Sequence, residues 1–382
     1  MRLFASLREL AGSARLDVDG GTPGEIVDAL SEKFGPKFGE IARAGSVVVD
    51  GERAEFDATL TGDEEVALLP PVSGGMGARP RPQRVLLVAN PVARTVSRPV
   101  LDVIEKALAA DFKLEVDETR RRGHATEMAE QAVRDGYDMM VVFSGDGTIN
   151  EAVNGLAGSE VALGVLPGGA TNVLARVMGM PTDPVEATGW LIAAALQGRG
   201  RRMGLGEIEG RYFVLNCGAG IDAEAMGKVD ERQATSRAQF ERAALGAVVK
   251  TVLGKYAGRE PFMTVTVDGG PPIEAITALT GRTDPYSFYK KYGLRLTPQA
   301  RLDGGLDVTV VERLPRLSSL ALIRQVFSGS LIKRKGVRYH HDAGRVEIVG
   351  REPFPVQVDG DNIGERERLT IGLRRDALWL VA

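Results

Sequence analysis

Between residues 84 and 202, short apolar runs alternate with segments whose apolar residues recur at helical spacing. The apolar runs predict strands at 85–89, 112–118, 137–143 and 161–166, and the helical spacing predicts helices at 99–110 and 125–135. Regular alternation of strands and helices is typical of an α/β domain with a parallel sheet. In such domains ligands bind at the carboxyl ends of the strands, so the loops there are candidate sites.

A different pattern begins near residue 204. Apolar and polar residues predict strands at 211–216, 262–267, 306–311, 346–349, 356–358 and 378–381. Helical spacing returns only at 237–253 and 317–332. Strands without regularly interposed helices are typical of antiparallel sheets. We therefore divide this part of the chain into an α/β domain at 84–203 and a mainly antiparallel β domain at 204–382.

The first 75 residues predict a small ββαββ-like unit. Residues 2–7 and 14–18 form a predicted hairpin, and residues 23–34 a helix that Thr22 caps. Further strands are predicted at 46–49 and 65–69, with Asp50-Gly51 as a turn. Pro and Arg are concentrated at 76–83, which we interpret as a linker between this domain and the rest of the chain.

Composition is typical of a compact globular protein. Of the 382 residues, 43% are hydrophobic and 26% are charged, and no apolar run approaches the ~18 residues of a membrane span. The single cysteine, Cys217, excludes an intramolecular disulfide, and the first residues lack a signal-peptide pattern. We therefore expect a cytoplasmic protein. An aromatic content of 5% without a recognition motif argues against nucleic acid as a partner.

Charge is distributed unevenly along the chain. Residues 1–75 carry 7 Lys and Arg against 14 Asp and Glu, whereas the remaining residues carry 41 against 37. The two parts have net charges of opposite sign, which favours different kinds of partner. The weakly basic part is compatible with an anionic membrane surface. The helix predicted at 317–332 continues into Lys333-Arg334-Lys335 and Arg338. We favour a packing helix with a solvated basic end over a helix that lies on the bilayer.

The most specific motif is Ser144-Gly145-Asp146-Gly147-Thr148, between the strand 137–143 and a helix predicted to open at Ile149-Asn150-Glu151. The two glycines permit positive φ and close approach of a ligand. Amides at the start of a helix bind phosphate, and a carboxylate among them needs a cation as a bridge. The motif therefore predicts a nucleotide–Mg²⁺ site with Asp146 as metal ligand; the alternative is an ordinary charged turn. No Gly-x-x-x-x-Gly-Lys-Ser/Thr sequence occurs, which excludes a P-loop enzyme.

Other motifs follow in a fixed order along residues 84–382. They are Asn90-Pro91, Thr119 before Gly123-His124-Ala125, the motif at 144–148 with Asn150-Glu151, residues 167–172 (Pro-Gly-Gly-Ala-Thr-Asn), Gly220-Ile221-Asp222-Ala223, residues 298–307 around Asp303, and residues 357–361 (Gln-Val-Asp-Gly-Asp). Together they resemble the diacylglycerol kinase catalytic family of bacterial lipid kinases and eukaryotic sphingosine kinases. The resemblance implies a Rossmann-like α/β nucleotide domain, an antiparallel β-sandwich lipid domain, and an active site between them. It also implies that the C-terminal segment returns toward the nucleotide domain.

Roles for individual residues follow from this resemblance. Asp303 is the implied general base for a lipid hydroxyl, and Asp146 the implied catalytic carboxylate that faces metal and phosphates. Asp307 points the same way in sequence but is alternatively a surface strand residue. Asp222 is implied to lie near the lipid head group. The implied nucleotide-binding residues are Asn90, Thr119, Ser144, Gly145, Asp146, Gly147, Thr148, Asn150, Gly169, Thr171 and Asp361.

Three positions depart from the commonest form of that family. Ser144 stands where a glycine is usual, Ala170 where many relatives have a threonine, and Asp361 where glutamate is usual. Thr171, next to Ala170, is a candidate substitute for the missing hydroxyl.

Residues 1–75 resemble the small subunit of molybdopterin synthase and related β-grasp sulfur carriers. Leu7-Arg8-Glu9-Leu10, residues 62–67 and the end at Gly74-Gly75 carry the likeness. Such carriers activate a free C-terminal glycine carboxylate, but here Gly75 is followed by Met76. Three interpretations remain open: cleavage after Gly75 that releases a carrier for sulfur-transfer partners, a docking module, and two neighbouring genes read as one.

We therefore expect an ATP- and Mg²⁺-dependent lipid kinase with a sulfur-carrier-like domain at its N-terminus. Diacylglycerol, converted to phosphatidate at an anionic membrane surface by a peripherally bound enzyme, is the expected substrate, and a sphingoid base is the alternative. NAD kinase-like activity is a second alternative, because that superfamily shares the Gly-Asp-Gly motif. A third is a non-catalytic scaffold, which the departures at Ala170 and Asp361 would permit.

Overall fold

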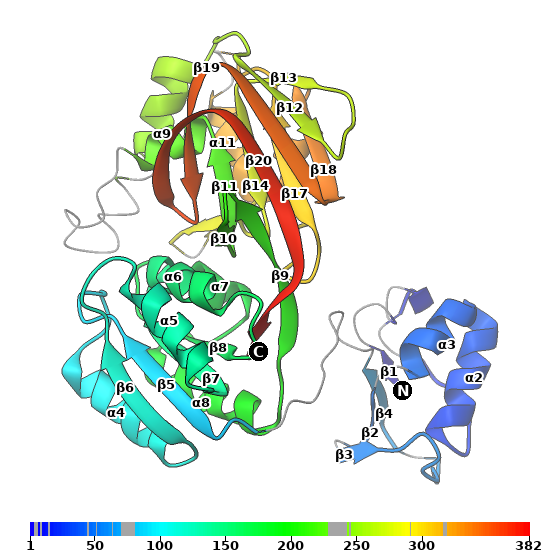
Figure 1. Cartoon of the computed structure of the whole chain (residues 1–382). Helices are drawn as coiled ribbons and strands as arrows, with labels where there is room; N and C mark the ends of the chain where they lie inside the picture. Colours follow the sequence, from blue (N-terminus) through cyan, green and yellow to red (C-terminus); the bar gives the residue numbers. More distant parts are fainter. Residues whose placement is uncertain are drawn as a thin grey trace. The chain divides into compact units, whose positions relative to one another are not determined.

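The computed structural model describes residues 1–3, 7, 10–13, 16–43, 46–50, 52–62, 64–69, 81–227, 243, 246–290, 292–315 and 319–382. The chain forms two compact units, Met1–Met76 and Gly77–Ala382, which Figure 1 colours from blue to red along the sequence. Each unit has its own hydrophobic core and is described separately.

The first unit is a four-stranded sheet with two helices. The strand order is β1-β4-β2-β3, with β1 and β4 parallel and the other neighbours antiparallel. Its core joins helix residues such as Ile26 and Leu30 to strand residues such as Val47 and Leu68. The elements are β1 (Arg2–Leu3), α2 (Pro23–Phe34), α3 (Pro36–Arg43), β2 (Ser46–Val49), β3 (Glu52–Ala54) and β4 (Val66–Leu69).

Local sequence signals predicted most of this unit. Helix α2 has the predicted bounds, and the Thr22 side chain accepts a hydrogen bond from the Glu25 amide as an N-cap does. The predicted hairpin is confirmed only at Arg2–Leu3, which forms β1 and pairs with β4. Leu7 is helical and residues 16–18 are in no strand, although Met1 and Leu16 exchange two backbone hydrogen bonds; the rest of that hairpin lies outside the described residues. Helix α3 was not predicted, although its Phe38 and Ala42 are buried at helical spacing.

The second unit begins with a parallel sheet in the order β8-β7-β5-β6. The chain passes from β5 outward to β6 and then back across β5 to β7 and β8. Because such crossovers are right-handed, α4 and α5 lie on opposite faces, and the order reverses between β5 and β7. The elements of this nucleotide lobe are β5 (Arg84–Ala89), α4 (Arg98–Ala109), β6 (Lys113–Glu118), α5 (His124–Arg134), β7 (Met139–Ser144), α6 (Asp146–Leu156), β8 (Ala162–Pro167), α7 (Val173–Val177) and α8 (Pro184–Leu196).

The rest of the second unit is an antiparallel lobe, which we call the sandwich lobe. Its strands are continuous with the parallel sheet because β20 pairs with β19 along much of its length and then joins β8 in parallel at Trp379 and Leu380. Figure 1 shows β20 and β9 running from one lobe into the other. Its strands are β9 (Arg201–Ile208), β10 (Arg211–Phe213), β11 (Asn216–Ala219), β12 (Met263–Val267), β13 (Ile273–Ala275), β14 (Thr277–Gly281), β15 (Ser287–Tyr289), β16 (Tyr292–Leu294), β17 (Leu306–Val311), β18 (Val337–Ala343), β19 (Arg345–Val358) and β20 (Asp361–Leu380).

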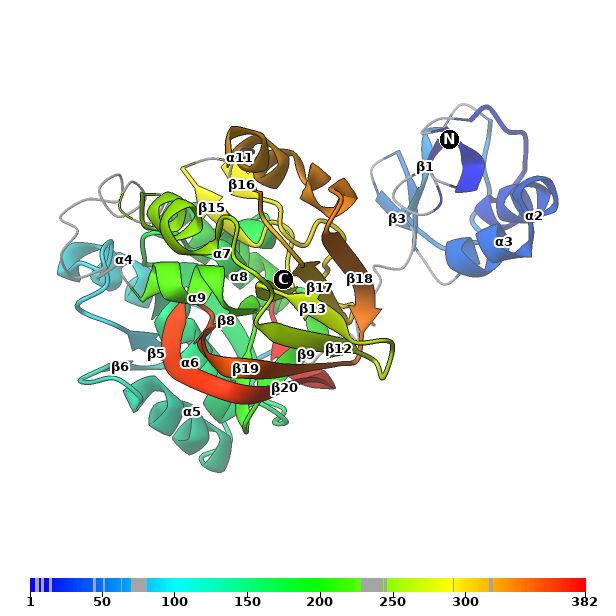
Figure 2. The ribbon, with the colours of Figure 1, turned by 90° about the horizontal axis from the view of Figure 1, so that it is seen from above.

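Helical segments cover this lobe, as Figure 2 shows from above. They are α9 (Ile221–Met226), a π-helical turn (Val252–Tyr256), α11 (Ser319–Ser328) and a 3₁₀ turn (Ser330–Lys333). The helix predicted at 317–332 is thus observed as α11 and the turn after it, and Leu322 and Val326 pack against the core. Only the C-terminal part of the helix predicted at 237–253 falls within the described residues. No helix in the described part of the chain has the length and apolar character needed to cross a bilayer.

Candidate active site

The Gly-Asp-Gly-Thr motif is the first turn of α6. Gly145 is the N-cap, so the helix begins at Asp146, three residues before the predicted start. Neither glycine uses the positive φ that its residue type permits, because Gly145 has φ −87° and Gly147 is helical. A β-carbon on Gly147 would meet no atom within 4 Å. The start of α6 therefore has open space beside Gly147, and phosphate oxygens are favoured near the amides at a helix start.

Gly145 is required for a different reason, which is close contact with a second loop. That loop follows β8, and an added β-carbon on Gly169 would lie 2.5 Å from the Cα of Gly145. On Gly168 it would lie 2.7 Å from the Cα of Ser144. The sequence singled out both loops, and the structure brings them into backbone contact beside the start of α6.

The Asp146 carboxylate points into the second loop, and the residue is partly buried. It accepts hydrogen bonds from the Thr171 hydroxyl at 3.2 Å, the Val173 amide at 2.9 Å and the Leu174 amide at 3.2 Å. These amides form the first turn of α7, so Asp146 joins the two loops. Burial raises the pKa of Asp146, while the Val173 and Leu174 amides oppose the rise.

A divalent cation would have to share this carboxylate with protein donors. An ionised carboxylate offers about four lone-pair positions, of which three are used here. Within the described residues no group of three or more His, Cys, Asp or Glu side chains could hold a metal ion. Mg²⁺ commonly binds through one or two carboxylates, with substrate phosphates and water completing its shell. One shared carboxylate therefore suits a cation that arrives with a nucleotide.

Asn90 and Thr148 meet where the strand order reverses. The Asn90 amide nitrogen donates to the Thr148 hydroxyl at 2.9 Å, which joins the end of β5 to the start of α6. Thr119 lies at the end of the neighbouring β6 and its amide donates to the Ala89 carbonyl at 2.9 Å. A cavity of about 1060 Å³ opens beside these strand ends. Its lining includes Pro91, Val96, Leu101, Val116 and Thr119.

Asn150 and Asp361 lie where the two lobes meet. Arg211 donates to the Asn150 side-chain oxygen at 3.1 Å and to Asp361 at 2.8 Å, and Arg122 also contacts Asp361 at 2.8 Å. Asp361 thus pairs with an arginine from each lobe. Neither Arg122 nor Arg211 was predicted to be part of the site, since only the fold brings these residues together.

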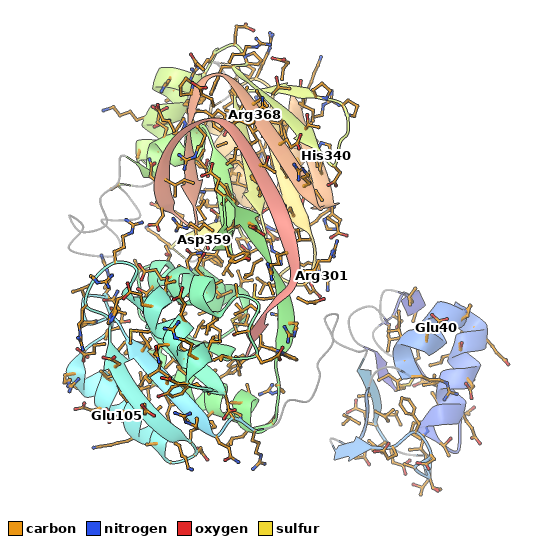
Figure 3. The ribbon with its side chains drawn as sticks, in the orientation of Figure 1. Glu40, Glu105, Arg301, His340, Asp359 and Arg368 are labelled. Carbon is orange, nitrogen blue, oxygen red and sulfur yellow. The ribbon has the colours of Figure 1, made fainter. Side chains whose placement is uncertain are left out.

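Asp359 is a second functional candidate that sequence reasoning missed. Its carboxylate accepts from the amides of Val214, Leu215 and Asn216, each at 2.9 Å, and from the Asn150 side chain at 2.7 Å. Burial raises its pKa to about 6, although these four donors act in the opposite direction. Figure 3 shows Asp359 at the junction of the two lobes. It fixes α6 against the segment between β10 and β11.

Asp222 belongs to a buried polar cluster in the sandwich lobe. Its Oδ2 accepts from the Tyr286 hydroxyl at 2.6 Å and from Gln357 at 2.8 Å, and Gln357 also donates to Asn216 at 2.8 Å. Burial raises the pKa of Asp222. Its Oδ1 makes no hydrogen bond of normal geometry within the described residues, although nearby amides lower the pKa. A hydroxyl donor would satisfy that oxygen.

Asp303 lies on the turn that enters β17. Its side chain is 12% exposed and pairs with Arg301 through two contacts of 3.1 and 3.2 Å. Arg201 and Arg282 are also close enough for their charges to interact with it. Figure 3 places Arg301 beside the strands that run between the lobes. Three arginines therefore surround the candidate base.

Arg282 holds this turn in place. The side chain is fully buried and donates to four carbonyls, those of Leu302, Gly304, Gly305 and Gly204. The first three flank Asp303, and the fourth belongs to β9. Arg282 also was not predicted, because an arginine in an unremarkable Gly-Arg-Thr sequence gives no local signal.

Asp307 is not a surface residue, which corrects the alternative interpretation. It is 1% exposed and accepts hydrogen bonds from the Tyr339 hydroxyl and from the Asp342 amide at 3.1 Å. Its Oδ1 also lies 2.9 Å from His341 Nδ1. Asp307 therefore fixes β18 to β17. Gly74 and Gly75 of the first unit lie outside the described residues.

Comparison with known proteins agrees with these observations. Residues 84–208 match the family model described as diacylglycerol kinase catalytic domain. Residues 216–374 match the YegS C-terminal NAD kinase beta sandwich-like domain, and residues 1–75 match the ThiS family.

Curated relatives named diacylglycerol kinase match most of the second unit. A diacylglycerol kinase of Staphylococcus carnosus is 27% identical over 288 residues, which cover 74% of this chain and 90% of the relative. A diacylglycerol kinase of Bacillus subtilis is 25% identical and covers 73% and 90%. The crystal structure of a putative diacylglycerol kinase from Bacillus anthracis has a TM-score of 0.62 at 23% identity, with coverage of 79% and 98%, and supports the fold.

The second unit thus has the two-lobed fold of a kinase, with an α/β nucleotide lobe and a β-sandwich lobe. It is a lipid kinase similar to diacylglycerol kinases, and it is preceded by a β-grasp domain that matches the ThiS family. The recognition, the fold class and the enzyme class predicted from the sequence are confirmed.

Proposed function

We propose that this chain transfers the γ-phosphate of ATP to the hydroxyl of diacylglycerol, giving phosphatidate, in a Mg²⁺-dependent reaction. The family supplies the phosphoryl donor, since its members are kinases. The named relatives are diacylglycerol kinases, which favours this acceptor over a sphingoid base. We also propose that the enzyme is cytoplasmic and acts peripherally at an anionic membrane.

The position of Asp303 carries the proposal. Leu302, the residue before it, packs in the core of the nucleotide lobe, whereas β17 after it belongs to the sandwich core. The carboxylate therefore lies at the boundary of a lobe with phosphate-binding loops and a lobe with a buried polar cluster. A base at that boundary can reach a hydroxyl and a phosphate that come from opposite sides.

In the proposed reaction the lipid oxygen forms a bond to the γ-phosphorus and the bond to the β-phosphate oxygen breaks. Asp303 accepts the hydroxyl proton, and ADP leaves. The amides at the start of α6, with Asn90, Thr148 and Thr171 nearby, would hold the phosphates. Mg²⁺, when bound with the nucleotide, neutralises phosphate charge, and Asp146 is the residue that would contact it. Asp222 would accept a hydrogen bond from the lipid head group.

Substitution of the base tests the mechanism. Asp303→Asn removes the proton acceptor and keeps the size of the side chain, so turnover should fall by about 100-fold or more. Asp268→Asn is the matched control, because Asp268 caps a distant turn by accepting from the Gly344 and Arg345 amides. Equal turnover of the two variants, with unchanged melting temperatures, would remove Asp303 from the mechanism.

For the first unit we propose the β-grasp fold of a sulfur carrier in a form whose terminal glycine is not free. Met76 follows Gly75, so no carboxylate is available for activation in the intact chain. Sulfur-transfer partners are proposed only for a processed form. Intact-mass measurement of the protein from its source cell tests this: fragments split after Gly75 would support processing, and one full-length species would exclude it.

A further inference from the structure

A small hairpin projects from the sandwich lobe beside α11. Strands β15 and β16 pair only with each other, and β16 contacts α11. Figure 2 shows the three elements together. The Phe327 ring of α11 lies 6.4 Å from the rings of both Tyr289 and Tyr292, edge to face. Tyr292 is nevertheless 56% exposed, so an aromatic cluster reaches the surface.

The same surface is strongly basic. Residues 286–290, 292–295 and 319–338 contain no Asp or Glu, and their cations are Lys290, Arg295, Arg324, Lys333, Arg334, Lys335 and Arg338. Packed elements supply two carboxylates, since Asp284 pairs with Arg295 and Glu312 with Arg338. Lys290, Lys333 and Lys335 are exposed. Positive charge therefore remains in excess around the aromatic cluster.

The hairpin is also tied to the proposed lipid site. Tyr286, immediately before β15, donates to Asp222 at 2.6 Å and accepts from the Asn216 side chain at 3.0 Å. Phe288 lies under the guanidinium of Arg176, 3.5 Å from ring centre to carbon, and so contacts the nucleotide lobe. Only two residues, Ser287 and Phe288, separate the buried Tyr286 from the aromatic cluster. A surface that bound the hairpin would be held next to Asp222.

We propose that the β15–β16 hairpin, α11 and the basic turn after it form the face that docks on an anionic lipid bilayer. We call these residues, 286–290, 292–295 and 319–338, the docking face. Exposed aromatic rings with lysines around them suit the boundary between head groups and acyl chains. Each cation near an anionic surface strengthens binding about fivefold. The proposal rests on the proposed function, because it brings the lipid site to the membrane that holds the substrate.

Vesicle binding without nucleotide tests the docking face independently of catalysis. The full chain is sedimented with vesicles of phosphatidylcholine alone or with phosphatidylglycerol. The variant Lys290→Glu/Lys335→Glu should bind the anionic vesicles at least about 25-fold more weakly, because it removes two cations and adds two anions. The control Lys106→Glu/Lys113→Glu changes two exposed lysines of the nucleotide lobe and should stay within about twofold of the parent. Tyr292→Ser should weaken binding to both kinds of vesicle.

Phosphorylation of a monomeric short-chain diacylglycerol separates docking from chemistry. The docking variants should keep the parent's rate on that substrate and lose rate only on vesicles. If no variant phosphorylates any lipid while the binding losses are as expected, the proposed function fails and the docking face stands. Parent-like binding by the Lys290/Lys335 variant, an equal loss in the control, or no binding of anionic vesicles by the parent would overturn the docking face.

Discussion

Replacement of Arg282 by methionine should leave the fold intact and disable the candidate base. The guanidinium donates to the carbonyls of Leu302 and Gly204 at 2.7 Å, to Gly305 at 3.0 Å and to Gly304. Methionine has a similar length but no donor. The turn that carries Asp303 would then lose the side chain that fixes it to β9.

The expected cost follows from two opposing effects. Four buried carbonyls without a donor would cost about 4 kcal/mol or more, at about 1 kcal/mol each. Burial lowers the pKa of Arg282 to about 10, so removal of the charge returns roughly 3 kcal/mol. The net loss of stability is then about 1–3 kcal/mol. A loss of that size lowers the melting temperature by about 2–4 °C for each kcal/mol in a unit this large and does not unfold it.

Catalysis should be affected far more than stability. Displacement of a reacting group by about 1 Å typically costs about 100-fold in rate. We therefore expect kcat of Arg282→Met to fall by about that factor while KM for ATP changes less than about threefold. Arg345→Met is the control, because Arg345 is an exposed arginine on the distant end of the sandwich lobe. Steady-state kinetics and thermal melts measure both effects.

A lower melting temperature of Arg282→Met together with the kcat of the control would contradict the proposed role of Arg282. The turn would then hold its geometry without the arginine. A further check is the combination of Arg282→Met with Asp303→Asn. Since Arg282 acts through Asp303, the double variant should be no slower than Asp303→Asn alone.

Three further outcomes are expected. Gly147→Ala should leave the melting temperature within about 1 °C, because its β-carbon meets open space, yet raise KM for ATP about tenfold by occupying the phosphate position; an unchanged KM would place the phosphates elsewhere. Gly169→Ala, unlike Gly147→Ala, should lower the melting temperature, because its β-carbon would lie 2.5 Å from the Cα of Gly145. A melting temperature equal to that of the parent would contradict the contact between the loops. Asp359 has a pKa of about 6 in the folded state, above the unfolded value near 3.9. Its contribution to the free energy of unfolding should therefore be present below pH 4 and lost as the pH rises to 6. Asp359→Asn should remove this dependence of stability on pH, and an unchanged dependence in denaturant titrations would refute the assignment.

The elements that the sequence predicted well carry strong local signals. Helix α2 has its capping threonine and first-turn proline, and β17 has the predicted bounds because its apolar run is bordered by turn residues. The Gly-Asp-Gly-Thr motif was correctly associated with a strand-to-helix junction. The sequence did not reveal why Gly145 is needed, because glycine permits positive φ without requiring it, and here the requirement is close contact with the loop at Gly169.

The parts that escaped prediction depend on contacts between distant residues. Asp359 and Asn150 are 209 positions apart, and Arg282 contacts Gly204 across 78 positions. From the sequence alone, Asp359, Asn150 and Arg282 would be expected to be exposed, because their side chains are polar. Only the return of β20 to the nucleotide lobe and the passage of β9 between lobes bring them together. Asp307 was open to two interpretations for the same reason, since its partners are on the neighbouring strand β18.

The most direct test of the account is transfer of labelled γ-phosphate from Mg·ATP to a panel of acceptors by the full chain. The panel contains diacylglycerol, sphingosine and NAD, presented in anionic mixed micelles where the acceptor is a lipid. We expect the parent and Asp268→Asn to label diacylglycerol and Asp303→Asn to leave it unlabelled. Label in NAD, or no label in any acceptor from a folded protein that binds ATP, would contradict the account.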